Sequence, residues 1–192
     1  MPQIWRVGAG DKEKDYMPLM LEEGVMMIGP GAIGDLTGLS APQIEVELVA
    51  QGAKATDSGV LLCFRDRARE NELVILRLGS VCFAVGAIAG PYEWRSQFDD
   101  VRSYWNAGYR NEQSWDLQHV RKVDWFALKE REALCWFRRG IYGGQQRFCG
   151  VQDRELHSYM QRLGYDGNNA GAVLEKIGVR TNGVNQYGFP AA

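Results

Sequence analysis

The chain has 192 residues, 45% of them hydrophobic and 24% charged, which is the balance of an ordinary globular protein. This length suffices for one full domain and a small appendage, and a net charge of −2 argues against a generic nucleic-acid-binding surface. No window of about 18 apolar residues predicts a membrane span. The first ten residues lack the basic and apolar segments of a secretion signal.

The cysteines give no sign of a disulfide framework. Cys63, Cys82, Cys135 and Cys149 contain no C-x-x-C pair, so we expect free thiols in a reducing cytoplasm. A zinc site built from Cys135, Cys149 and His157 is conceivable, but the spacing matches no common framework. We therefore expect neither a metal nor another cofactor, and a cytoplasmic location.

Charge is distributed unevenly along the chain. Residues 1–50 hold three basic and eight acidic side chains, whereas residues 102–154 hold ten basic and six acidic ones. Because phosphate contact needs only a local basic patch, the second half could carry one. An ordinary solvated face with ion pairs explains the same counts.

The first half of the chain predicts two strands followed by two helices. Strands are expected at 3–7 and 25–28, with a short helix between them within 16–24. A capping box with proline in the first turn begins a helix at Ser40, and Gly52 ends it. A second helix is expected from Thr56 or Asp57 to about Glu70.

The second half is richer in predicted strands. Apolar, β-branched runs on both sides of Gly79-Ser80 predict a hairpin that continues outward to Trp94. A long aromatic and polar loop should follow. Further strands are expected at 118–128, 133–137 and 147–151, and a closing helix at 153–164.

This order predicts an α+β fold. Five or more short strands without regular helical crossovers argue against a doubly wound parallel sheet and favour a small mixed β-barrel with flanking helices. We expect one domain over 1–163. The Gly/Asn-rich residues 164–192 are expected to form a loosely packed extension or a linker.

One glycine pattern raises the possibility of a dinucleotide site. Gly29, Gly31 and Gly34 form G-x-G-x-x-G after an apolar strand. In that fingerprint the last glycine opens a helix that receives a pyrophosphate. Here no helical period begins until after Ser40, and Pro30 lacks the N–H that the turn would use. The pattern therefore predicts a strand that ends in a glycine-rich turn.

Hydrolase and nuclease motifs are absent from the sequence. The chain has no G-x-S-x-G, H-E-x-x-H or G-x-x-x-x-G-K-[ST]. His119 and His157 stand in unrelated contexts, and Cys149 has no visible orienting partner. We expect no enzymatic activity within this chain.

Aromatic residues give a stronger signal. Tyr92 and Trp94 alternate, so in a strand they face the same side. Arginines are interleaved with the aromatic residues that follow. Rings stack on nucleobases while cations hold phosphates, so the cluster fits a ring-lined nucleic-acid pocket. Rings that simply cover a barrel end would look the same.

The order of motifs resembles the EVE branch of the PUA-like superfamily. Three motifs over about residues 3–163 carry the resemblance. The first is Gly29, Gly34, Asp35 and Leu36; the second is Val85, Gly86, Gly90, Tyr92 and Trp94; the third is His119, Arg121, Val123 and Trp125.

The chain departs from the family pattern at three places. Pro30 stands where a tryptophan often follows, which leaves part of the usual aromatic wall to other residues. The hairpin enters through Glu72-Leu73, and the loop over 95–117 is long.

The resemblance implies a reader of modified DNA. Such domains rotate a modified base out of the duplex into an aromatic pocket and serve as sensors of modification-dependent restriction systems, often fused to a nuclease. The expected partner is double-stranded DNA that contains 5-methylcytosine, 5-hydroxymethylcytosine or N6-methyladenine, the first two being favoured. A cleaving domain would lie outside this chain, and no membrane is involved.

This resemblance and the residue pattern together give a set of candidate site residues. Asp35 either caps the turn that follows it or accepts from an exocyclic amine, and His119 either reads the base or orients a loop. The expected base-pocket residues are Trp5, Asp35, Tyr92, Trp94, Trp115, Gln118 and His119. The expected phosphate contacts are Arg95, Arg102, Arg110, Arg121, Lys122, Arg138 and Arg139.

Two other functions fit the sequence. PUA-like barrels also hold RNA, so an RNA-binding module is one alternative. An enzyme with a nucleotide pocket, in which Cys149 or His157 takes part, is the other.

Overall fold

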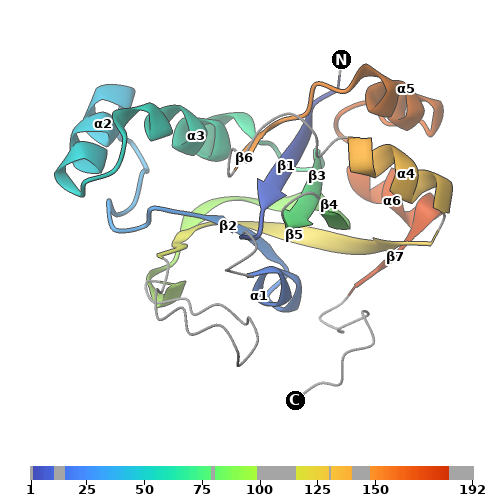
Figure 1. The fold of residues 1–192 in the computed structure, drawn as a ribbon, viewed down its shortest axis with the longest axis horizontal. Coiled ribbons are helices and arrows are strands. Elements are labelled where there is room, and N and C mark those ends of the chain that lie inside the picture. Colours follow the sequence, from blue (N-terminus) through green and yellow to red (C-terminus); the bar gives the residue numbers. More distant parts are fainter. Residues whose placement is uncertain are drawn as a thin grey trace.

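The computed structural model describes residues 2–10, 16–78, 81–98, 116–129, 131–139 and 148–181. Within these ranges the chain forms a mixed sheet of seven strands with six α-helices around it (Figure 1). The strands are β1 (Ile4–Gly8), β2 (Val25–Ile28), β3 (Leu73–Leu78), β4 (Val81–Trp94), β5 (His119–Leu128), β6 (Phe148–Gly150) and β7 (Gly178–Arg180). The α-helices are α1 (Met17–Glu22), α2 (Ala41–Ala50), α3 (Ser58–Leu62), α4 (Arg131–Arg139), α5 (Arg154–Arg162) and α6 (Ala170–Ile177). Short helical turns are η1 (Ala55–Asp57), the π-helical η2 (Cys63–Arg67) and η3 (Ser96–Phe98).

The strands follow the order β2-β5-β4-β3-β1-β6, and β7 pairs with the far half of β5. The β1–β3 pair is parallel, and the other described pairs are antiparallel. The predicted hairpin is confirmed as β3 and β4.

A closed barrel is not what the described strands form. The path is open, because β2 and β6 stand at its two ends and are only four and three residues long. Such short edge strands offer few backbone groups for a closing ladder. The long strand β4 still bends across the sheet, with a register shift against β5 between Ile88 and Tyr92. The α/β composition is confirmed, and the sheet is a curved open one.

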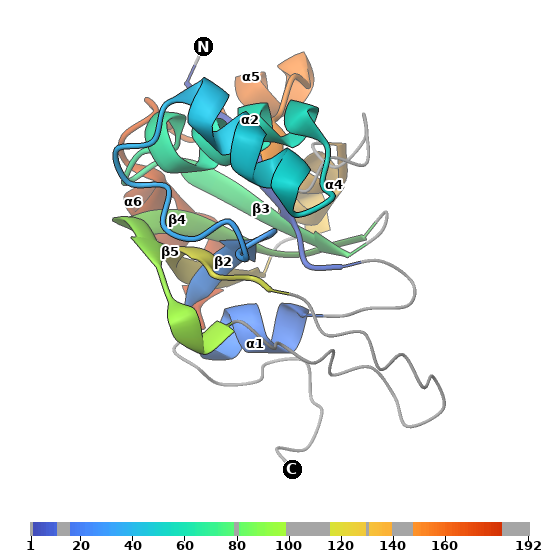
Figure 2. The same cartoon turned by 90° about the vertical axis from the view of Figure 1, so that its left-hand side faces the viewer.

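Each face of the sheet carries its own hydrophobic core. Side chains alternate along β1, so that Trp5 and Val7 enter one core while Ile4 enters the other. The first core lies under α1, α2 and α3, and the second lies under α4, α5 and α6. Figure 1 shows α2 and α3 together at one end of the sheet and α4, α5 and α6 at the other, and Figure 2 looks from the α2 end.

The expected helix after Ser40 is confirmed as α2. The Ser40 N–H donates to Gln43 Oε1 at 2.8 Å, which closes the capping box, and proline occupies the first turn. Ile44 and Leu48, four residues apart, are buried against the first core.

The expected strand at 133–137 is wrong, since this segment lies in α4. Ala133 and Phe137 are both fully buried in the second core, four residues apart, while Cys135 between them is exposed. This spacing is that of a helix that buries one face against a core. A short apolar run does not distinguish the two structures by composition.

Residues after 164 are more ordered than their Gly/Asn-rich composition predicts. Ala170, Val173, Leu174 and Ile177 are buried in the second core, at the spacing of one helical face. The strand that follows, β7, extends the sheet beside β5. The part of this segment that the structure describes therefore belongs to the domain.

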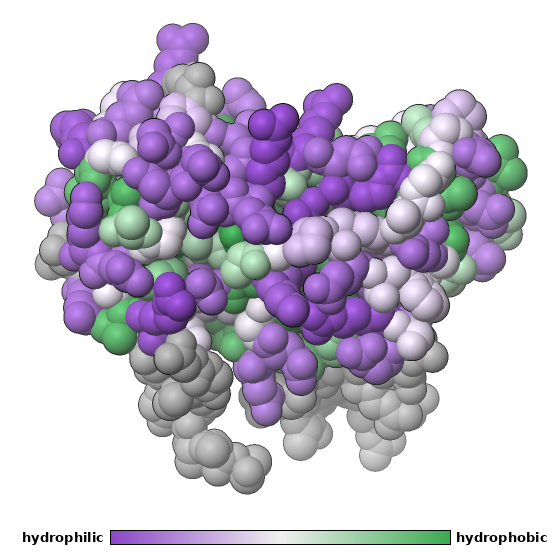
Figure 3. Space-filling view, turned by 180° about the vertical axis from the view of Figure 1, so that it is seen from behind, coloured by the Kyte–Doolittle hydropathy of each residue, from purple (hydrophilic) through white to green (hydrophobic). Residues whose placement is uncertain are grey.

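One face of the described residues is mainly polar. Figure 3 shows one face on which hydrophilic residues dominate and apolar ones form small separate patches. Among the described helices, none has the length and apolar character that crossing a bilayer requires.

Gly86 provides a test of this packing. A Cβ at Gly86 would overlap Val123 Cγ1 and lie 2.7 Å from Trp125 Cε3, inside the first core. We expect Gly86→Ala to lower the free energy of unfolding by about 1–3 kcal/mol, as overpacking does, in urea denaturation. Gly59→Ala is the control, because no atom lies within 4 Å of its Cβ position in α3. It should be neutral or stabilise by about 0.5–1 kcal/mol. Equal effects of the two substitutions would contradict the packing.

Candidate functional site

Strand pairing brings part of each of the three sequence motifs to the start of β5. His119 pairs with Ile28 at the end of β2 and with Trp94 at the end of β4. Tyr92 pairs with Arg121. The loop after β2, residues 29–36, which we name the glycine loop, therefore begins beside the aromatic end of β4.

His119 joins the glycine loop to Tyr92. Its Nε2 lies 2.8 Å from the Pro30 carbonyl oxygen, and its Nδ1 lies 2.9 Å from Tyr92 Oη. A carbonyl only accepts, so Nε2 carries the proton and Nδ1 accepts from the Tyr92 hydroxyl. That hydroxyl in turn accepts from the Leu36 N–H at 3.1 Å. The tyrosine thus bonds to the far end of the same loop.

Both side chains of this pair are held in their neutral forms. His119 is fully buried, and this burial lowers the pKa of its imidazole below the ordinary value of 6.5. Burial also raises the pKa of Tyr92 to about 12, against the opposing hydrogen bond from Leu36. His119 is therefore a positioning residue: the expectation that it orients a loop is what the geometry supports, because neither nitrogen is left to read a base.

Asp116 and Gln118 hold the start of the glycine loop. The Asp116 carbonyl accepts from the Gly31 N–H at 3.1 Å, and its carboxylate accepts from the Ala32 N–H at 2.6 Å. Gln118 is buried directly beneath Gly31, where a Cβ would come within 2.6 Å of Gln118 Cβ. Its amide lies 3.4 Å from the Ser96 carbonyl oxygen.

Among the expected pocket residues, Asp35 caps a turn with its carboxylate, whereas Trp94 keeps part of its ring exposed. Asp35 Oδ1 accepts from the Thr37 N–H and hydroxyl at 2.9 and 2.8 Å, so it caps the turn that follows it. Trp94 is 38% exposed, and its indole nitrogen lies 3.5 Å from the Gly31 carbonyl oxygen. Of the rings expected in the pocket, Trp94 presents the most open face in the described residues.

A cleft of about 690 Å³ is lined in part by Tyr92, and we name it the Tyr92 cleft. It lies where the glycine loop ends, where η2 ends and where β4 bends. Its volume falls within the range of small-molecule sites. The lining residues are Thr37, Gly38, Arg65, Asp66, Arg69, Glu70, Pro91, Tyr92 and Arg121.

Arg121 was expected to contact phosphate. In the structure its side chain is buried and forms part of the cleft wall. It is 4% exposed, and its guanidinium donates to the carbonyls of Phe64, Arg65 and Gly90 at 2.7, 2.6 and 3.1 Å. Burial lowers the pKa of Arg121, and nearby carboxylates, Glu70 foremost, oppose the shift. Each of the three guanidinium nitrogens thus donates to a protein carbonyl.

Most cleft residues were missed by the sequence analysis. The run Arg65–Glu70, R-D-R-A-R-E, is highly charged and follows a helix, as solvated helix ends often do. Its one distinguishing signal is the density of both charge signs beside a predicted strand, which is weak without the fold. Pro91 and Tyr92, by contrast, belong to the second motif.

Trp5 does not form a pocket wall. It is 5% exposed in the first core, where it stacks on Phe148 with ring centres 4.8 Å apart and donates its indole N–H to Glu72 Oε2 at 2.6 Å. Its apolar alternation in β1 turns it inward. Three further expected residues, Trp115, Arg102 and Arg110, lie outside the described residues.

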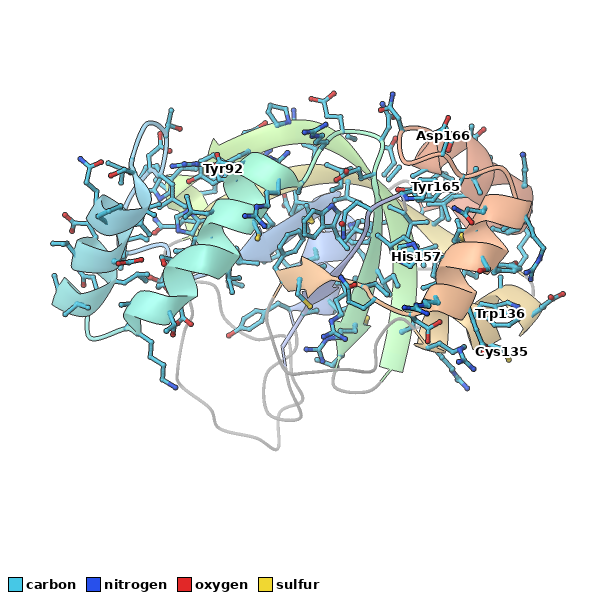
Figure 4. All side chains as sticks on the ribbon, turned by 90° about the horizontal axis from the view of Figure 1, so that it is seen from above. Tyr92, Cys135, Trp136, His157, Tyr165 and Asp166 are labelled. Carbon is cyan, nitrogen blue, oxygen red and sulfur yellow. The ribbon has the colours of Figure 1, made fainter. Side chains whose placement is uncertain are left out.

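The remaining expected phosphate contacts lie on other surfaces. Arg138 and Arg139 belong to α4, whose Trp136 is at the opposite end of the molecule from Tyr92 in Figure 4. Arg139 pairs there with Glu155 at 3.0 Å and Asp153 at 3.4 Å. Near the cleft end, Arg95 pairs with Glu93 at 2.8 Å, and the exposed Lys122 lies 3.9 Å from the same residue.

The residues of the enzyme and zinc alternatives have other partners. Cys149 Sγ accepts from Arg6 Nε at 2.8 Å, and His157 Nε2 donates to the Val151 carbonyl at 2.9 Å. Across the residues that the structure describes, no three His, Cys, Asp or Glu side chains are grouped to hold a metal ion.

Comparison with known families gives one match. A family model described as Domain of unknown function (DUF8426) matches residues 5–137. The chain belongs to the DUF8426 family. No curated protein matches it.

The DUF8426 match runs from β1 to α4. It therefore contains the glycine loop, the Tyr92 cleft and the whole of the His119 arrangement, while α5, α6 and β7 lie beyond it. Arg138 and Arg139, two of the expected phosphate contacts, lie just past its end.

The buried His119 predicts a pH-dependent stability. Its pKa in the folded chain lies below 6.5, so the unfolded chain binds the proton first as the pH falls. The stability that neutral His119 provides is therefore fully present above about pH 6.5 and is lost as the pH falls towards the folded pKa.

We expect His119→Gln to cost about 1–3 kcal/mol at pH 7.5, through the hydrogen bonds it loses. Because glutamine does not titrate, the difference in free energy of unfolding between wild type and variant should shrink from pH 7.5 to pH 5. Chemical denaturation across this range measures it. A difference that stays constant with pH would show that His119 does not titrate as described.

Proposed function

We propose that this chain binds double-stranded DNA through a modified base, which rotates out of the duplex and enters the Tyr92 cleft. The observation that carries the proposal is an open cleft of about 690 Å³ walled by a tyrosine whose hydroxyl is fixed by His119 and Leu36. A ring held in one orientation offers a stacking face at little entropic cost.

Trp94 supplies a second ring outside the cleft. It lies two residues after Tyr92 in β4, its indole is tied to the glycine loop, and part of its surface is open. An exposed indole stacks on a base at about 1–3 kcal/mol. Such stacking offsets the few kcal/mol that extrusion of a base costs.

The charges of the Tyr92 cleft suit a base better than a phosphate. Arg65, Arg69 and Arg121 stand among Asp66 and Glu70, so both signs line it. A phosphate would meet the carboxylates unfavourably, whereas the polar edge of a base has both donors and acceptors. Exposed Arg69 is the guanidinium best placed to contact the backbone beside an extruded base.

The resemblance to EVE-type PUA-like domains supports the same proposal. The glycine loop, the end of β4 and the start of β5 carry its three motifs, and they meet at His119. On this proposal the curved sheet is a PUA-like fold that serves as the sensor of a modification-dependent restriction system. The cleaving activity would reside in a separate nuclease domain.

Binding to matched duplexes tests the proposal. Fluorescence anisotropy is measured with two labelled duplexes that differ only in one 5-methylcytosine. We expect tighter binding to the methylated duplex. Equal affinity for the two at moderate salt would refute modification reading, and preferential binding of a structured RNA hairpin would favour the RNA alternative.

A matched pair of arginine variants locates the surface. Arg69→Gln should weaken binding and reduce the slope of log affinity against log salt by about 1, while Arg138→Gln on α4 should leave both unchanged. Trp94→Ala should cost about 1–3 kcal/mol of binding free energy. If Arg138→Gln weakens binding as much as Arg69→Gln does, the DNA does not bind at the Tyr92 cleft.

A further inference from the structure

One carboxylate in the Tyr92 cleft takes part in a bidentate ion pair. Arg65 donates to both oxygens of Asp66, Nε to Oδ1 at 2.6 Å and Nη2 to Oδ2 at 2.7 Å. Arg65 is itself fixed, because its Nη1 donates to the carbonyls of Leu36 and Leu39. A bidentate pair of this kind sets the plane of the carboxylate as well as its position.

Asp66 remains open to a ligand despite this pairing. Its side chain is 51% exposed, whereas that of Arg65 is only 16% exposed. Each carboxylate oxygen has two acceptor sites, so each can take a second hydrogen bond after Arg65 has used one. The hydrogen bonds from Arg65 also lower the pKa of Asp66, so at neutral pH it accepts and does not donate.

The other polar groups of the cleft are largely occupied. The Tyr92 hydroxyl is used by His119 and Leu36, the Arg121 guanidinium by three carbonyls, and the Thr37 hydroxyl by Asp35. Arg69 and Glu70 are exposed, and the charge of Glu70 acts on the buried Arg121. Asp66 is therefore the cleft group with both a fixed orientation and free hydrogen-bonding capacity.

We propose that Asp66 reads the exocyclic amino group of the base in the Tyr92 cleft. The inference rests on the proposed function. The site then favours bases that carry an amino group at this position of the pairing edge, cytosine or adenine, over thymine, which carries a carbonyl oxygen there. A carboxylate accepts from an amino group, but it meets the carbonyl oxygen of a keto base as a second acceptor with no proton between them.

Thymine is the matched competitor for 5-methylcytosine. The two bases carry the same methyl group and differ at the pairing edge, where an amino group is replaced by a carbonyl oxygen and the adjacent ring nitrogen gains a proton. Placing each opposite an abasic site removes base-pair breaking from the comparison. Anisotropy with these two duplexes should show wild type preferring 5-methylcytosine by about tenfold, the discrimination of one well-placed base contact.

Variants of the two exposed carboxylates, Asp66 and Glu70, separate recognition of the base by Asp66 from the effect of removing a negative charge. Asp66→Asn keeps the shape and adds a donor for a carbonyl oxygen, so the preference should vanish or turn towards thymine. Asp66→Ala removes both the hydrogen bond to the amino group and the unfavourable contact with the thymine carbonyl, so its affinity ratio should fall towards one without turning towards thymine. Glu70→Gln removes the same charge from the same cleft and should keep the wild-type ratio. Thermal unfolding checks that each variant is folded.

The outcomes distinguish the two proposals. If wild type binds methylated duplex above unmodified duplex but Asp66→Asn and Asp66→Ala keep the wild-type ratio, base reading by Asp66 is refuted and the proposed function stands. An equal change in Glu70→Gln would also refute it, since charge alone would then set the ratio. If wild type binds neither duplex above the unmodified control, the proposed function fails and this inference fails with it.

Discussion

The hydrogen bond from His119 to the Pro30 carbonyl is the contact on which the site depends. His119 is the first residue of β5, and it pairs with β2 on one side and β4 on the other. Its ring then adds two side-chain bonds to those ladders, one to the glycine loop and one to Tyr92. A fully buried imidazole with both nitrogens bonded has one acceptable tautomer and one orientation, so it transmits the geometry of the sheet to the loop.

Arg121, two residues further along β5, fixes the η2 side of the cleft as His119 fixes the glycine loop. Strand alternation places its side chain on the same face as that of His119. A buried guanidinium is costly, and here two backbone carbonyls of η2 and one at the bend of β4 accept its hydrogen bonds. Because two of those carbonyls belong to Phe64 and Arg65, Arg121 also fixes the backbone that carries Asp66. One strand therefore sets both walls of the cleft.

Much of the secondary structure could be predicted because it depends on local signals. The capping box at Ser40 and the antiparallel pairing of β3 with β4 are examples, since the signals for both lie in neighbouring residues. The strand assigned to 133–137 failed because an apolar run of five residues does not reveal whether one face or two will be buried. Helix α6 was not predicted, because glycine and asparagine residues precede it in the sequence. Its apolar face is buried only by contact with the second core, which is formed by distant parts of the chain.

Part of the candidate site could be predicted from the sequence, but the contacts that its residues make could not. The three motifs marked Tyr92, Trp94 and His119, which the sheet does bring together. Their roles depend on backbone carbonyls and N–H groups, such as those of Pro30 and Leu36, which no residue pattern encodes. The same is true of Arg121, which looks like a phosphate contact until its three carbonyl acceptors are known. Whether the sheet closes into a barrel also depends on pairing between strands that are far apart in the sequence, which local patterns do not reveal.

The glycine pattern shows why a motif has to be interpreted through its geometry. Gly29 and Gly31 are required because the loop lies flat on the start of β5: a Cβ at Gly29 would come 2.5 Å from the Asp116 carbonyl oxygen, and one at Gly31 would meet Gln118. No helix opens after Gly34, since α2 begins only at Ala41. These glycines bring backbone close to protein rather than to a pyrophosphate. Their effect is to let His119 reach Pro30, so the loop that looks like a ligand-binding fingerprint instead forms part of the frame that orients Tyr92.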